Sequence, residues 1–255
     1  MPNHKPALLV ATILLGVMFP FVNCGQINTS TSSNQAVLGS SAHDLLSDDK
    51  YTSLVIEIQY VTGYAPSTAA QNALVSFLQA RLNKPGGITV QADAPLAPPG
   101  NTSYSLNDVL AIELANRTLH NSGNQITAYF LFLDGNSTSD SGSGQILGTA
   151  YSPSAMVIYE KTIQADSGSL GKPSRAVLEE TVLEHEFGHI LGLVNVGSPP
   201  LAAHQDTAHG AHCTNTSCLM YWQVDTSNFL ANLLGGSVPT LDADCLNDLR
   251  ANGGK

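Results

Sequence analysis

Positively charged residues are scarce in this chain. Lys and Arg together number 10 among 255 residues, whereas Asp and Glu number 20, so the formal net charge at neutral pH is −10. Proteins that bind nucleic acid need clustered positive charge to neutralise phosphates. The composition therefore argues against nucleic acid as a partner. A net negative surface mainly favours solubility, and it does not specify a substrate or an oligomeric state.

Long apolar runs are absent except near the N-terminus. Residues 7–22 form a mostly apolar run that is short for a membrane span, and Cys24 follows directly after Asn23. This pattern is typical of an export signal. Because a cysteine closes the run, it resembles a bacterial lipoprotein signal, although a small residue is usual where Asn23 stands. We expect a signal peptide at 1–24, lipidation of Cys24, and a membrane-anchored protein on the periplasmic or cell-surface side of a bacterium. Ordinary secretion and an uncleaved anchor are the alternatives.

Cysteine is also sparse, with four in the chain. If Cys24 carries lipid, an odd number remains: Cys213, Cys218 and Cys245. An oxidising compartment would then allow one disulfide and one free thiol. Cys213 and Cys218 are closest in sequence, but Cys245 could pair with either of them.

The remaining chain has the length of one folded domain. Residues 25–48 begin with a stretch rich in Ser, Thr, Asn and Gln, and we expect a flexible tether there, followed by a single domain at 49–255. Apolar periodicity predicts strands at 53–60, 88–92, 125–133, 146–151 and 155–160, and helices at 67–83, 105–117 and 174–191. The continuous apolar run at 125–133 indicates a strand buried on both faces. This order predicts an α+β fold, with a mixed twisted sheet and helices packed on it.

The predicted helix 174–191 contains His185-Glu186-Phe187-Gly188-His189. Two histidines four residues apart lie on one helical face, so both imidazoles can reach one metal ion. Glu186 lies about 100 degrees round the helix from His185, where its carboxylate can accept a proton from a water bound to the metal. The bare pattern also fits a pair of surface histidines without a metal. The following residues favour a metal site.

Gly192 follows three residues after His189. This spacing resembles the metzincin family of zinc peptidases, in which a glycine at this place ends the helix and turns the chain back beneath the metal. A glycine can adopt the positive φ that such a turn needs. Metzincins place a third histidine ligand where this chain has Asn195, whose neutral amide is a poor zinc ligand.

A later segment supplies a candidate third ligand. His212 is followed at once by Cys213, and Cys218 and Met220 come next. This order resembles that of the archaemetzincins, in which the third histidine precedes a cysteine, four residues, a second cysteine and the methionine of the Met-turn. On this alignment residues 194–211 are an insertion. The resemblance covers residues 174–222 in motif detail.

The resemblance implies a zincin fold with an upper subdomain at 49–192, a lower subdomain at 193–255 that carries the Met-turn, and a terminal helix. It implies zinc ligands at His185, His189 and His212, with Met220 beneath the metal. It also implies that the strand at 145–152 is a sheet edge where a peptide substrate could add as an extra strand, although a closely packed edge is an equal alternative.

Archaemetzincins also bind a second zinc ion through four cysteines, two of which come from a later Cys-X-X-Cys pair. This chain has only Cys245 there. We therefore expect one catalytic zinc ion and no second one. In an exported protein Cys213 and Cys218 are then expected to form a disulfide that holds the loop of His212.

His204 and His209 remain alternative third ligands. A glutamate ligand, as in gluzincins, is excluded because no glutamate follows Glu186. We predict a zinc-dependent endopeptidase that hydrolyses peptide bonds by attack of a metal-bound water activated by Glu186. The alternative is a catalytically silent surface lipoprotein that uses the same fold for binding or metal capture. The intact Glu186 favours catalysis, since a binding module needs no general base.

Overall fold

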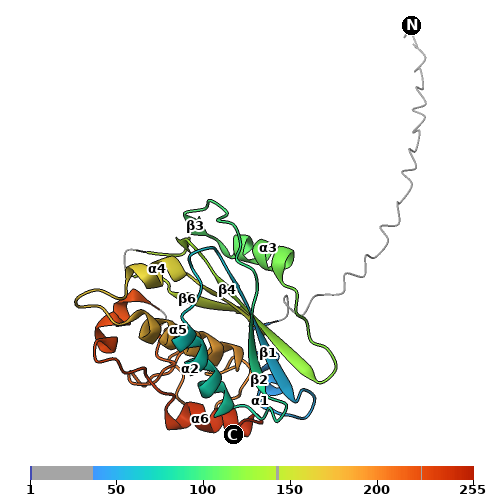
Figure 1. Cartoon of the computed structure of the whole chain (residues 1–255). Helices are drawn as coiled ribbons and strands as arrows, with labels where there is room; N and C mark the ends of the chain where they lie inside the picture. The colour runs from blue at the N-terminus through green and yellow to red at the C-terminus, as the bar shows by residue number, and fades with distance from the viewer. Residues whose placement is uncertain (2–36, 142–143, 225) are drawn as a thin grey trace. The chain divides into compact units, whose positions relative to one another are not determined.

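A five-stranded sheet forms the centre of the computed structural model, which describes Met1 and residues 37–141, 144–224 and 226–255. The strand order is β2-β1-β4-β7-β6, with β6 antiparallel to β7 at one edge and all other pairs parallel (Figure 1). The strands are β1 Ser53–Tyr60, β2 Ile88–Ala92, β4 Gln125–Phe132, β6 Gly148–Ser152 and β7 Ala155–Ile158. The predicted mixed sheet is confirmed.

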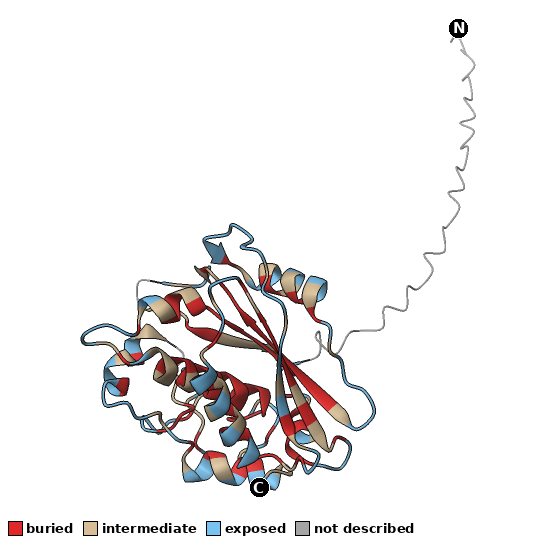
Figure 2. Cartoon of the chain, viewed as in Figure 1, coloured by how far each residue is buried: buried red, intermediate tan, exposed pale blue. Residues whose placement is uncertain are grey.

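Strand β4 is buried on both faces, as its apolar run predicts. Alternate side chains point to opposite sides of a strand. Phe130 and Phe132 lie in one apolar cluster, whereas Tyr129 and Leu131 lie in another. Figure 2 shows the middle strands of the sheet almost wholly buried. Two cores therefore flank the sheet, one on each face.

Helices cover both faces of the sheet. Helices α2 Thr68–Gln79 and α5 Arg175–Ile190 pack together and belong to the core that contains Phe130. Helix α3 Leu106–Asn116 packs against the other core, and Ser105 and Asp108 cap its N-terminus reciprocally. The three predicted helices are confirmed, with ends that differ by a few residues.

Several short elements were not predicted. The proposed tether 25–48 is wrong for its last residues, because helix α1 Ala42–Leu46 buries Leu45 and Leu46 in the core. The Lys84 ammonium group holds the segment by donating to carbonyl oxygens, including that of Asp44 at 2.9 Å. Strand β3 Ser103–Tyr104 pairs with strand β5 Asn136–Ser137 in a separate two-stranded sheet. The other unpredicted elements are helix α4 Glu160–Ala165 and the 3-10 helix η2 Ser227–Leu233.

The chain after α5 is mostly irregular until α6 Ala243–Ala251, which is the expected terminal helix. Gly192 has a φ of +74° and turns the chain, and Val194 and Asn195 also have positive φ. Cys24 lies outside the described residues, as does the expected signal peptide apart from Met1. No helix in the described part of the chain is long and apolar enough to cross a membrane.

Candidate metal centre

Helix α5 carries two of the three histidines that converge here. Ser174 caps its N-terminus by accepting a hydrogen bond from the backbone N–H of Val177. Its second half is buried all round, so His185 and His189 project into the protein with exposed fractions of 0% and 8%. Their Nε2 atoms lie 3.1 Å apart.

The third histidine comes from the irregular segment after α5. His212 lies with its ring centre 5.4 Å from that of His185 and 5.0 Å from that of His189. One nitrogen from each of the three rings lies within 4.8 Å of the others. Tetrahedral zinc with bonds of about 2.0–2.1 Å separates its ligand nitrogens by about 3.3 Å. The spacing therefore fits one zinc ion held by three imidazoles.

Backbone carbonyls determine which ring nitrogens carry a proton. A carbonyl oxygen only accepts, so Nδ1–H of His185 donates to Leu219 O at 2.7 Å, and Nδ1–H of His212 donates to His209 O at 2.6 Å. In the neutral ring the lone pair is then on Nε2. His189 Nδ1 is buried and has no hydrogen-bond partner among the described residues. Both carbonyl-bound rings are thus oriented for metal binding through Nε2.

Burial keeps these rings neutral. It lowers the pKa of His185 to about 4, against a smaller opposing effect of the hydrogen bond to Leu219. Burial also lowers the pKa of His189 well below its ordinary value, and the neighbouring His185 and His212 add to this shift. Neutral imidazole is the form that binds a metal ion, so protons compete weakly for these two ligands.

Glu186 lies beside the edge strand β6. Its Oε2 accepts a hydrogen bond of 2.6 Å from the backbone N–H of Ala150, and its exposed fraction is only 2%. Gly148 makes room for this carboxylate, because a Cβ there would lie 3.0 Å from Glu186 Cγ and 2.6 Å from Val182 Cγ1. The sheet edge therefore orients the carboxylate that sequence reasoning assigned as general base.

Met220 lies directly beneath α5. A Cβ on Gly188 would lie 2.3 Å from Met220 Sδ, so the glycine between the two histidine ligands lets the methionine pack closely. At Gly192 a Cβ would lie 2.6 Å from the backbone nitrogen of Ser198, and the positive φ also favours glycine. Both positions of the motif therefore require glycine for steric reasons.

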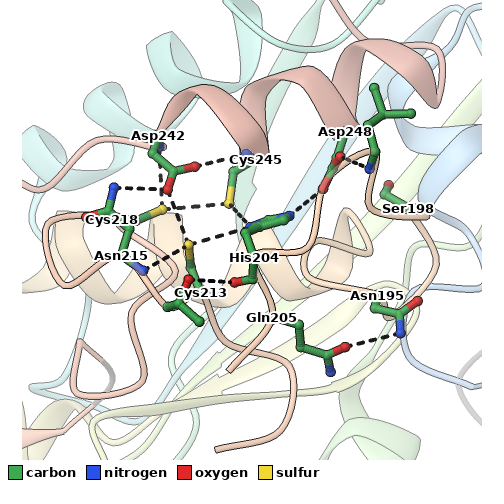
Figure 3. A network of polar contacts seen from close by, with 12 residues as sticks. Asn195, Ser198, His204, Gln205, Cys213, Asn215, Cys218, Asp242, Cys245 and Asp248 are labelled. Carbon is green, nitrogen blue, oxygen red and sulfur yellow. Dashed lines mark hydrogen bonds and ion pairs between the residues drawn. The ribbon is translucent and has the colours of Figure 1, made fainter. Parts of the chain in front are cut away.

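The remaining predicted residues lie elsewhere. The Asn195 side chain donates to Gln205 Oε1 at 3.2 Å. His209 pairs with Asp206 and stacks on Trp222. His204 belongs to a second cluster, with Cys213 and Cys245 (Figure 3). Of the three candidates for third ligand, only His212 meets His185 and His189.

The expected disulfide is not present. Cys213, Cys218 and Cys245 are all free and buried, and the sulfur nearest to Cys218 in a hydrogen-bond geometry is that of Cys245, at 3.7 Å. The prediction of a Cys213–Cys218 bridge is wrong for this structure. Proximity in sequence was a poor guide, because the sulfur of Cys213 instead contacts His204 Nδ1 at 3.5 Å and Asp242 Oδ2 at 3.2 Å.

Sequence reasoning missed the groups that orient the site. The carbonyl of Leu219 and the N–H of Ala150 are backbone groups, which almost every residue type has, so the sequence does not reveal their role. Asp248, which bonds to His204, lies 44 residues further along the chain. The role of Gly148, which leaves space for the carboxylate of Glu186, likewise depends on the tertiary structure.

Comparison with known proteins identifies the fold. No protein-family model matches the sequence, and no curated protein does. Among solved structures, the chain resembles an archaemetzincin from Methanopyrus kandleri, with 15% identity and a TM-score of 0.51 over 82% of this chain and 98% of that one. The fold is archaemetzincin-like. A zinc-dependent peptidase from Methanocorpusculum labreanum matches at 14% identity and a TM-score of 0.49, over 76% of this chain and 99% of that one.

Proposed function

We propose that this chain is a zinc-dependent endopeptidase. The observation that carries the proposal is the convergence of His185, His189 and His212 beside the carboxylate of Glu186. Three protein ligands leave a fourth position for water or substrate, which is the arrangement of catalytic rather than structural zinc. Bound zinc supplies a Lewis acid that polarises a carbonyl and lowers the pKa of water. The archaemetzincin-like fold supports the same proposal.

The side chains of this protein divide the remaining work. Glu186 accepts a proton from the attacking water and can deliver it to the leaving amine. Its hydrogen bond from Ala150 holds one oxygen, so the carboxylate is oriented before substrate arrives. His185 is sealed from solvent, whereas His212 is partly exposed, so we infer that substrate approaches from the side of His212.

The edge of the sheet favours an extended peptide as substrate. Among the described strands, β6 pairs only with β7, and residues 149–151 are partly exposed. A peptide can add to such an edge as a further strand, with its backbone N–H and carbonyl groups paired to β6. Because this pairing extends on both sides of the scissile bond, we propose internal cleavage of unstructured chains.

The experiment compares the full chain, purified in mild detergent, with Glu186→Gln. We expect the wild type to contain zinc and to hydrolyse casein. Glu186→Gln should keep the zinc and lose activity by about 10²–10⁴-fold, the usual contribution of a general base. Glu180→Gln, on the same helix and lining a different cavity, is the matched control and should remain active.

Three outcomes contradict the proposal. Full activity of Glu186→Gln would show that Glu186 is not the general base. Undiminished hydrolysis by zinc-free protein would show that the reaction needs no metal. A zinc-loaded wild type that cleaves no unstructured protein would favour the silent binding or metal-capture protein instead.

The third ligand is tested by metal content. His212→Ala should lose the ion held by His185 and His189, and with it all hydrolysis. His209→Ala and Asn195→Ala should keep both properties, because neither side chain reaches the three rings. Loss of zinc in Asn195→Ala alone would show that the alignment of the motif is wrong.

We also propose that Cys24 is lipidated and anchors the exported protein to a membrane. The support is the leader sequence alone. Metabolic labelling with a fatty acid should mark the wild type and leave Cys24→Ser unlabelled. Equal labelling of both proteins, or of neither, would contradict the anchor.

A further inference from the structure

A second group of metal-binding side chains is buried beside the catalytic histidines. His204, Cys213, Asp242 and Cys245 each present a ligand atom within 4.8 Å of the others. The sulfur of Cys218 joins them at 3.7 Å from that of Cys245 (Figure 3). All three cysteines have an exposed fraction of 0%, and His204 is 4% exposed. The three thiols and the imidazole are thus sealed from solvent.

The cluster draws on three separate parts of the chain. His204 lies in the inserted segment 194–211, Cys213 and Cys218 bracket the loop before Met220, and Cys245 lies in the first turn of α6. Apolar packing alone does not explain an imidazole with three thiols at one point. Thiols and imidazole are the donors that zinc prefers in proteins.

Three distances within the cluster match those of a tetrahedral zinc site. Bonds of about 2.3 Å to sulfur and about 2.0 Å to nitrogen separate two sulfur ligands by about 3.8 Å and a sulfur from a nitrogen by about 3.6 Å. In the structure, Nδ1 of His204 lies 3.5 Å from Cys213 Sγ and 3.9 Å from Cys245 Sγ. The sulfurs of Cys218 and Cys245 are 3.7 Å apart.

The carboxylate of Asp248 orients the histidine of this cluster. Its Oδ2 lies 2.8 Å from His204 Nε2, and its Oδ1 accepts the backbone N–H of Leu201 at 2.7 Å. With Nε2–H donated to the carboxylate, the lone pair of the ring is on Nδ1, which faces the sulfurs. In zinc sites a histidine ligand commonly donates its other ring N–H to a carboxylate, which fixes the orientation of the ring.

Backbone N–H groups point at two of the sulfurs. Asn215 N lies 3.4 Å from Cys213 Sγ, and the nitrogens of Met220 and Asp242 each lie 3.4 Å from Cys218 Sγ. Such contacts stabilise thiolate, which is the form that binds metal. Asp242 also lies in the cluster: its Oδ2 accepts from Cys213 Sγ at 3.2 Å and from the Asn215 side chain, and its Oδ1 caps α6 at Cys245 N. With Cys218 as the fourth ligand the set is three cysteines and one histidine, a usual composition of structural zinc sites, so Cys218 is a better fourth ligand than Asp242.

We propose that Cys213, Cys218, Cys245 and His204 bind a second zinc ion, and that Asp248 orients His204. Archaemetzincins hold their second zinc with four cysteines, and the lack of the fourth cysteine in this chain led to the expectation of a single zinc ion. The structure provides a different solution, because the inserted segment delivers a histidine to the place left by the missing cysteine. A closed set of four protein ligands is typical of a structural site.

This second site would also position the catalytic one, an extension that rests on the proposed function. Cys213 is adjacent to His212, and Cys218 is adjacent to Leu219, whose carbonyl holds His185. Cys213 N also donates to Met220 O at 2.7 Å. A metal held by the two cysteines would thus fix the segments that place two of the three catalytic histidines.

The test substitutes cobalt for zinc in the full chain, purified in mild detergent under reducing conditions. We expect two metal ions per chain and a near-ultraviolet thiolate-to-cobalt absorption band. His204→Ala should lose one ion and most of that band, whereas His204→Cys should restore both. Asp248→Asn should weaken binding at this site by about 10–100-fold.

Controls separate this proposal from the peptidase proposal. His212→Ala should lose the other ion and keep the thiolate band, and His209→Ala should change neither. The readouts are metal content and absorption, so they hold whether or not the protein cleaves peptides. A wild type with no thiolate band, an unchanged band in His204→Ala, or a native disulfide between Cys218 and Cys245 would overturn the proposal.

Discussion

The two histidine clusters contain neighbouring residues, His212 in one and Cys213 in the other, yet they are built by different means. The three-histidine cluster takes two ligands from one turn of α5, is partly open to solvent at His212, and has a carboxylate beside it. The Cys–His cluster takes its ligands from three distant segments and is closed. An open set suits turnover and a closed set suits stability. Neighbouring clusters of metal-binding side chains thus differ in donor type and in access to solvent, and the roles that we propose for them follow from these differences.

The largest effect that separates the clusters is expected from graded chelation. A mild chelator should remove the ion of the open, three-ligand site first, with essentially complete loss of hydrolysis and little change in thermal unfolding. A stronger chelator should then strip the closed site and lower the unfolding temperature, since a structural metal contributes directly to folding. Metal content, activity and melting are followed together. Simultaneous loss of both ions would erase the distinction between the clusters.

The next effect concerns the carboxylate that makes the open cluster chemically competent. Gly148→Ala should push Glu186 from its hydrogen bond with Ala150, because the added methyl group collides with Val182 and Glu186. A displacement of about 1 Å at a catalytic group costs up to about 10²-fold in rate. We expect kcat to fall by about 10–100-fold with both ions retained. Gly235→Ala, where a Cβ meets nothing within 4 Å, is the control. Unchanged kcat in Gly148→Ala would show that β6 does not position the base.

A smaller effect tests the packing beneath the open cluster. Gly188→Ala forces the buried Met220 side chain to move, since the new Cβ would lie 2.3 Å from its sulfur. Methionine is flexible, so we expect a destabilisation of about 1–3 kcal/mol, measured by denaturant unfolding. Met220→Ala in the same background should recover part of this loss. If Gly188→Ala unfolds like the wild type, the Met-turn does not pack as tightly as the structure indicates.

The smallest effect concerns Glu160, a carboxyl group outside both clusters that makes the stability of the protein depend on pH. Glu160 is fully buried with Arg175 at 2.8 Å. Burial, and then the neighbouring Glu179, raise its pKa to about 9 against the opposing effect of Arg175, from an ordinary value of 4.5. The folded state therefore binds the proton of Glu160 more tightly than the unfolded state does. The free energy of unfolding falls as the pH rises from 4.5 to about 9.

Glu160→Gln removes this dependence. The variant should be nearly as stable as the wild type at about pH 5 and more stable by about 1 kcal/mol or more at about pH 8. Urea unfolding at both pH values measures the difference, and Asp48→Asn, at an exposed carboxylate, is the control. A gain that is equal at both pH values would mean that Glu160 is ionised in the folded protein.

The sequence predicted the elements whose periodicity is strong. The alternation in β1, the apolar run of β4 and the helical spacing of α2 and α5 each bury one defined set of side chains, so the pattern in the sequence is the pattern of burial. Helix α1 and the two-residue strands β3 and β5 are too short to show a period. Their stability comes from tertiary contacts.

The same distinction between local pattern and tertiary contact applies to the residues of the two clusters. His185, Glu186 and His189 could be identified because a helix brings residues four apart together. His212 could be proposed only through the order of Cys213, Cys218 and Met220 that follows it. The partnership of His204 with Asp248 and Cys245 joins residues more than forty positions apart, and no local pattern encodes it. The sequence alone therefore led to the expectation of a disulfide and did not reveal the partners of His204.

Trp222 is the only tryptophan of the chain. Its ring lies flat against that of His209, with centres 4.2 Å apart and planes within 1° of parallel. The carbonyl of His209 in turn holds the ring of His212. Intrinsic fluorescence therefore reports on one small region of the protein. Emission from this single indole should change when the loop of His212 shifts, so metal loading at the open cluster can be followed optically without a label.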